Sequence, residues 1–143
     1  MNINTLTIKA QELLQSAMAT ARQHKQQALE PLHILEAATA DDNSVASYLI
    51  GRVGGNLQSI RREVAEAIKL LPRVETSDDN IYFSRETSAL IQRAVELTTK
   101  LSDRYASVEH LIAAMAQERS SARDILKREG ISESQLLEAI REF

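Results

Sequence analysis

The residues best suited to chemistry in this sequence are its three histidines, because a neutral imidazole can bind a metal ion or carry a proton. The enzyme hypothesis is therefore a metal-dependent hydrolase that uses His33, His110 and Glu109. On a helix, the adjacent Glu109 and His110 would point about 100° apart, so the pair cannot hold one metal ion without ligands from elsewhere. His33 and His110 also recur at equivalent positions of a repeated pattern, which favours a structural role. His24 lies among Gln and Lys residues, and we expect it to be solvated.

Other catalytic signatures are missing from the sequence. It contains no cysteine, which excludes thiol catalysis, disulfides and zinc-cysteine sites. Neither a G-x-x-x-x-G-K-[ST] phosphate loop nor a G-x-S-x-G nucleophile turn occurs. The sequence predicts a non-enzymatic domain that holds no metal ion and no cofactor.

The composition favours a helical protein and argues against two classes of partner. The chain has 143 residues, of which 43% are hydrophobic and 26% charged, with four Gly and two Pro. A net charge of −3 and 3% aromatic residues argue against nucleic-acid binding. No apolar run reaches about 18 residues and no signal peptide is recognisable, which argues against membrane binding. Because the chain lacks cysteine, we expect a reducing compartment and a cytoplasmic location.

The spacing of apolar residues predicts four helices within residues 6–71. The first follows the candidate N-cap Thr7 and places Ile8 on its apolar face. Pro31 begins the second helix, since proline is favoured at the first helical position. A short third helix follows, and Asn56 caps the fourth.

Residues 72–82 are polar and lack this periodicity, which predicts a connector. The pattern then begins again in residues 83–143. Most equivalent residues are 77 positions apart, and a one-residue slip reduces this to 76 near the end, as in the pairs Leu6 and Phe83, Leu13 and Leu90, His33 and His110, and Gly54 and Gly130. We therefore predict one all-α domain over residues 1–143, with eight helices formed by a duplicated four-helix repeat that packs about a pseudo-twofold axis.

Three segments of this pattern resemble a known family: L-T-I-K-A-Q-E-L-L-Q-S-A from Leu6, E-P-L-H-I-L-E-A from Glu30, and Y-A-S-V-E-H-L-I-A-A from Tyr105. Over its whole length the chain resembles the Clp N-terminal domain. The segments E-P-L-H and L-P-R-V bring it nearest to the branch found in AAA+ protein disaggregases. The resemblance implies a substrate-recognition domain of a hexameric stress-response chaperone, whose ATP and magnesium sites lie in other domains.

The resemblance also implies partners. It predicts binding of exposed apolar segments of unfolded or aggregated polypeptides and their transfer to the pore of a homohexamer formed with the protein's own ATPase domains. Contact with the DnaK chaperone system is implied for other domains. The alternative is an adaptor-binding or degron-binding domain of a protease-coupled unfoldase of the ClpA or ClpC type. A symmetric receptor for phosphorylated arginine is disfavoured, because Leu32 replaces in the first copy the carboxylate that Glu109 supplies in the second.

Three polar site residues follow from the family motifs: Thr7 in L-T-I-K, Asp103 in S-D-R-Y and Glu109 in S-V-E-H-L. Each also has a structural reading, as a helix cap, a turn residue and a first-turn carboxylate respectively. Both readings stay open at this point.

A site for unfolded chains should be a shallow apolar groove with polar edges. We expect the first and sixth helices to wall it, Tyr105 to lie beside it, and Leu90, Leu97 and Leu111 to form its floor. Leu97 is the most informative of the three leucines because it replaces Thr20 of the first copy. For Leu90 and Leu111 the alternative is an ordinary place in the core.

Overall fold

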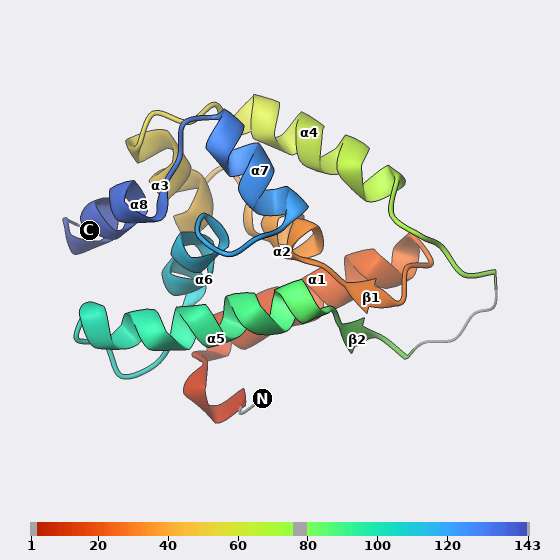
Figure 1. The fold of residues 1–143 in the computed structure, drawn as a ribbon, viewed down its shortest axis with the longest axis horizontal. Coiled ribbons are helices and arrows are strands. Elements are labelled where there is room, and N and C mark those ends of the chain that lie inside the picture. Colours follow the sequence, from red (N-terminus) through yellow and green to blue (C-terminus); the bar gives the residue numbers. More distant parts are fainter. Residues whose placement is uncertain (1–2, 76–79, 143) are drawn as a thin grey trace.

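The computed structural model describes residues 3–75 and 80–142, and within these ranges the chain forms eight α-helices and a short 3-10 helix, Ile3–Thr5 (Figure 1). The first repeat contains α1 (Ile8–Gln23), α2 (Pro31–Ala38), α3 (Val45–Arg52) and α4 (Leu57–Lys69). The second contains α5 (Arg85–Lys100), α6 (Val108–Met115), α7 (Ser121–Arg128) and α8 (Glu133–Arg141). The predicted helical fold is confirmed. Residues 76–79 of the predicted connector lie outside the described residues.

Matching N-caps begin the long first helix of each repeat. The Thr7 hydroxyl accepts a hydrogen bond from the backbone N–H of Ala10 at 3.1 Å, as predicted. Ser84, 77 positions later, accepts one from Thr87 at the same distance. The expectation for Ile8 is wrong, because its side chain is 73% exposed. Ile8 precedes the buried Ala10 by two residues and so points about 200° away from it around the helix.

Two short parallel pairings join the repeats, and the all-α prediction did not include them. Strand β1 (Ala28–Leu29) pairs with β2 (Tyr82–Phe83), so the predicted connector ends inside a strand. A bridge between Leu6 and Ala106 is the equivalent pairing, since each partner lies 77 positions from its counterpart. Strands of two residues are too short to give an alternating pattern, which is why the sequence did not predict them.

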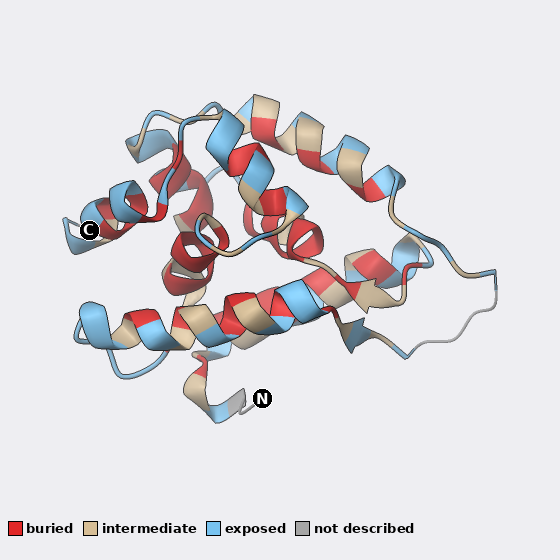
Figure 2. Ribbon diagram, viewed as in Figure 1, coloured by how far each residue is buried: buried red, intermediate tan, exposed pale blue. Residues whose placement is uncertain are grey.

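The helix contacts have the predicted pseudo-twofold pattern. Helices α2 and α6 form the centre and are the most continuously buried (Figure 2). Helix α1 packs on α2 as α5 packs on α6, and α4 packs on α2 as α8 packs on α6. Across the repeats, α3 packs on α8 and its counterpart α7 packs on α4. Each repeat therefore buries its apolar face against the other.

Candidate functional site

The histidine of the first repeat caps α2 from inside the protein. The backbone N–H of Glu30 donates to His33 Nδ1 at 2.9 Å. Because a backbone N–H can only donate, Nδ1 is unprotonated and the ring proton is on Nε2. Nε2 therefore donates to Gln26 Oε1 at 2.7 Å. The predicted structural role of this histidine is confirmed by these contacts.

The histidine of the second repeat caps α6 in the same way. The Ser107 N–H donates to His110 Nδ1 at 2.9 Å, and Nε2 lies 2.9 Å from Asp103 Oδ2. Asp103 is 77 positions after Gln26, so the two residues are equivalent partners of equivalent histidines. His110 also has the predicted structural contacts. Asp103 acts as the turn residue that holds its ring.

The first of these histidine sites is closed to solvent. Gln26 is only 2% exposed, and its Nε2 donates to the carbonyl oxygen of Ile68, at the end of α4, at 2.7 Å. Burial, with the charge of nearby His24 as a second cause, lowers the pKa of His33 to about 4. His33 is therefore neutral at pH 7 and suited to capping.

The second histidine site opens into a surface groove of about 580 Å³. The Asp103 side chain is 46% exposed, in contrast to its buried counterpart Gln26. The groove is formed by the N-cap of α1, the α5–α6 loop, the first turn of α6 and the end of α8; its lining residues are Thr7, Leu101, Asp103, Arg104, Tyr105, Ser107, Glu109, His110, Ile140 and Arg141.

Four predicted site residues meet in this groove: Thr7, Asp103, Tyr105 and Glu109. The Thr7 hydroxyl donates to Ser107 Oγ at 3.1 Å, which links the caps of α1 and α6. Of the two predicted walls, α6 contributes residues of its first turn, whereas the first helix reaches the groove only with its N-cap. Thr7 is a cap and a groove residue at once, so its structural and functional readings do not exclude each other.

The predicted floor of the groove is wrong. Leu90, Leu97 and Leu111 are at most 1% exposed and belong to the hydrophobic core. Their apolar helical spacing indicated a buried face, but it could not show that other helices cover this face completely. Leu101 and Ile140 instead provide the apolar surface of the groove. Ile140 was missed because α8 reaches the site only through tertiary packing.

The groove combines charged groups with an apolar surface. Its charged residues are two carboxylates, Asp103 and Glu109, and two guanidinium groups, Arg104 and Arg141, around an apolar floor. The Arg104 guanidinium lies 5.8 Å from the centre of the Tyr105 ring. Across the described ranges, no group of three or more His, Cys, Asp or Glu side chains could hold a metal ion. No helix within these ranges is long and apolar enough to span a membrane.

Comparison with known proteins identifies relatives over the whole chain. Residues 5–129 match the family model described as the Clp repeat (R) N-terminal domain. The chain is 39% identical over 143 residues to the chaperone protein ClpB of Porphyromonas gingivalis, and 34% identical to that of Bacteroides thetaiotaomicron. Each alignment covers 100% of this chain but only 16% of the relative, so the chain spans a small part of the ClpB length.

Solved structures show the same fold at lower identity. The N-terminal domain of Hsp104 from Candida albicans has a TM-score of 0.79 at 23% identity, with 92% of this chain and 85% of that chain covered. The N-domain of ClpV from Vibrio cholerae has a TM-score of 0.80 at 17% identity, with 96% and 84% covered.

Proposed function

This chain belongs to the Clp repeat N-terminal domain family, and we propose that it is the domain with which a ClpB-type chaperone binds unfolded or aggregated polypeptide. One observation carries the proposal: an open groove brings Thr7, Asp103, Tyr105 and Glu109 together over an apolar floor. Its ligand would be an exposed apolar segment. The domain would act by binding alone.

The chemistry of the groove supports this class of ligand. Unfolded polypeptides share exposed apolar side chains and free backbone groups rather than one sequence. An apolar floor with a polar rim suits the side chains, and carboxylate and carbonyl oxygens suit backbone N–H groups. Charges of both signs on the rim give no strong preference for a highly charged partner.

The wider role rests on the ClpB relatives, of which this chain covers a small part. We propose that the bound segment passes to the pore of a hexamer formed by the parent protein's ATPase domains. ATP and magnesium would be held in those domains, since this sequence contains no phosphate loop. A protease-docking loop in the parent protein would instead favour the alternative role in a protease-coupled unfoldase.

A titration tests the proposal. The isotope-labelled chain is mixed with a polypeptide kept unfolded by reduction and alkylation, and its amide shifts are followed by NMR. We expect saturable shifts at Thr7, Asp103 and Glu109, and none when the same polypeptide is added in its folded form. Unchanged groove signals at millimolar ligand would overturn the proposal.

Two tyrosines offer a matched pair of variants. Tyr105 and Tyr48 are 46% and 49% exposed, and only Tyr105 lines the groove. Tyr105→Ser should weaken binding about tenfold, because it removes an exposed aromatic contact from the site. Tyr48→Ser should leave the dissociation constant unchanged. Equal effects of the two substitutions would argue against binding at the groove.

A further inference from the structure

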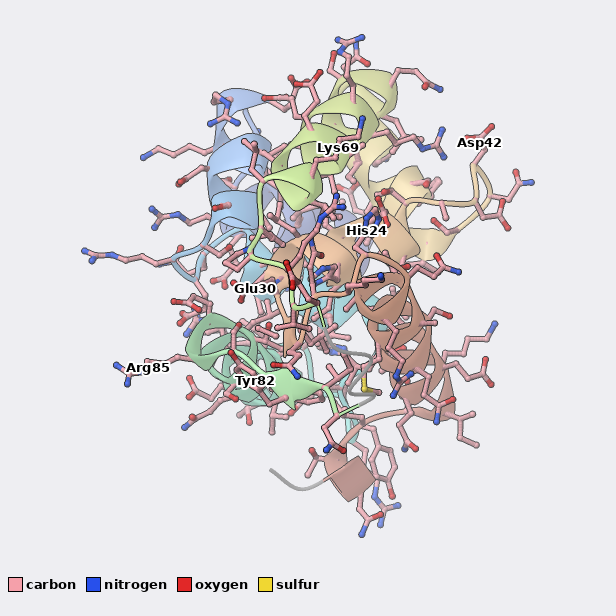
Figure 3. The ribbon with its side chains drawn as sticks, turned by 90° about the vertical axis from the view of Figure 1, so that its right-hand side faces the viewer. His24, Glu30, Asp42, Lys69, Tyr82 and Arg85 are labelled. Atoms are coloured by element: carbon pink, nitrogen blue, oxygen red, sulfur yellow. The ribbon has the colours of Figure 1, made fainter. Side chains whose placement is uncertain are left out.

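The molecule already contains one extended segment bound at the position equivalent to the groove. Four groove residues, Asp103, Arg104, Tyr105 and Ser107, are the counterparts of Gln26, Gln27, Ala28 and Glu30 in the first repeat. Those counterparts line a smaller hollow of about 230 Å³, together with Leu71 at the end of the first repeat and with Pro72 and Val74 of the connector. Figure 3 faces this side, where the connector descends from the end of α4 near Lys69, past Glu30, toward Tyr82.

A backbone hydrogen bond holds the first part of the connector there. The N–H of Val74 donates to the carbonyl oxygen of Lys25 at 2.8 Å. Lys25 has a φ of 57°, in the left-handed region that non-glycine residues rarely adopt. This turn carries the chain from α1 towards β1, at the edge of the hollow that the connector lines.

The second repeat has the same left-handed turn, but no part of the described chain donates a hydrogen bond to it as Val74 does in the first repeat. Ser102, the counterpart of Lys25, has a φ of 58°, also in the left-handed region. Among the hydrogen bonds within residues 3–75 and 80–142, none is accepted by the Ser102 carbonyl oxygen. A left-handed residue directly after the C-cap is a common way to end a helix, and the Asp103 N–H donates to the Thr98 carbonyl oxygen at 2.8 Å as the Gln26 N–H donates to that of Ala21 at 2.9 Å. The two copies therefore have the same backbone conformation at this turn.

The side chains near Ser102 differ from those near Lys25 in a way that suits a bound ligand. Gln26 bonds to Ile68 of the same chain, whereas Asp103 uses one oxygen for His110. Within the described ranges, the other Asp103 oxygen and the Glu109 carboxylate make no hydrogen bond or ion pair. Acceptors without donors therefore face the groove, which suits a ligand that supplies N–H groups.

Building on the proposed function, we infer that the groove binds an extended segment of another polypeptide through its main chain, with one ligand N–H donating to the Ser102 carbonyl oxygen. The apolar side chain of that ligand residue lies against Leu101 and Ile140. The connector on the first repeat is the geometric template. Main-chain recognition explains how one site accepts many sequences, because every non-proline residue offers the same donor.

A synthetic peptide and its ester analogues test the proposed hydrogen bond to the Ser102 carbonyl oxygen directly. The probe is a synthetic peptide with the sequence of residues 69–75, K-L-L-P-R-V-E, added to the isotope-labelled chain. We expect it to shift the carbonyl carbon of Ser102 and the amide of Asp103. An analogue in which an ester oxygen replaces the valine N–H keeps the side chain and loses the donor. It should bind about tenfold more weakly, while the same replacement at the second leucine should have little effect.

The outcomes separate this inference from the proposed function. If unfolded polypeptide shifts the groove but the valine ester binds as well as the parent peptide, main-chain recognition is wrong and the proposed function stands. If neither ligand shifts the groove, both fail. If the Ser102 and Asp103 signals depend on protein concentration without peptide, the occupant is a second copy of this chain, and the inference is overturned.

Discussion

Gln26 and Asp103 hold equivalent histidines in the two repeats, but their surroundings have diverged. Gln26 lies under the end of α4 and the connector, and its amide uses both an acceptor and a donor, toward His33 and Ile68. Asp103 has no such cover and presents a carboxylate to the groove. A neutral amide suits the buried position because a charge there would lose its hydration. Duplication therefore preserved the histidine cap, and the segments that cover Gln26 in the first copy leave its counterpart Asp103 open to the groove in the second.

Among the substitutions that test this difference between the repeats, Gln26→Glu should destabilise the protein the most. The substitution keeps the length of the side chain but places a carboxylate oxygen against the Ile68 carbonyl oxygen in the protein interior. We expect the free energy of unfolding to fall by about 4 kcal/mol, measured by urea denaturation at pH 7. A loss under about 1 kcal/mol would show that the first site is less closed than its burial indicates.

A second test replaces a residue by its counterpart from the other repeat. Leu97 is fully buried, whereas its counterpart Thr20 is partly exposed. Leu97→Thr should reduce the free energy of unfolding by about 3 kcal/mol, because it removes apolar volume and buries a hydroxyl. Thr20→Leu is the control and should change stability by less than about 0.5 kcal/mol. A stable Leu97→Thr protein with impaired polypeptide binding would restore Leu97 to the site.

The pH dependence of stability tests how strongly burial affects the histidine of the first repeat. The pKa of His33 is lowered from 6.5 to about 4 in the folded chain, so the unfolded chain takes up this proton first as the pH falls. The contribution of His33 to the free energy of unfolding is therefore fully present above about pH 6.5 and is lost as the pH falls toward 4. Between pH 7 and pH 5 this histidine should account for about 2 kcal/mol of lost stability.

Urea denaturation of a His33→Gln variant at both pH values isolates that contribution. The variant should lose about 2 kcal/mol less than the parent chain between pH 7 and pH 5, because it lacks the titrating ring. The His24→Gln variant keeps the buried ring and removes only the second cause of its lowered pKa, so most of the loss should remain in that variant. Equal losses for the parent chain and the His33→Gln variant would show that His33 titrates normally.

The smallest expected effect on stability comes from Asp103→Asn. The amide oxygen can still accept from His110, and the position is open to solvent, so the free energy of unfolding should change by less than about 0.5 kcal/mol. Binding of unfolded polypeptide should nevertheless weaken, about threefold to tenfold in the dissociation constant, because a charged acceptor is lost from the groove. Unchanged binding in the NMR titration would remove Asp103 from the site.

Local sequence patterns predicted the parts of this protein that depend on neighbouring residues. Thr7 was predicted as a cap because its hydroxyl only needs to reach the N–H groups of the next turn. The family motifs placed Thr7, Asp103 and Glu109 in one site, and the structure brings them together with Tyr105. Leu90, Leu97 and Leu111 were misplaced because helical periodicity identifies an apolar face but not its cover.

By itself, the sequence determined the duplicated register, the two histidines at matching positions and the caps that begin the helices, since each follows from residue types at fixed spacing. Only the tertiary structure decided that Gln26 is covered and Asp103 is open. The covering groups, Ile68 and Val74, lie more than forty residues from Gln26 along the chain. Burial depends on which distant segments pack together, and this information is absent from local spacing.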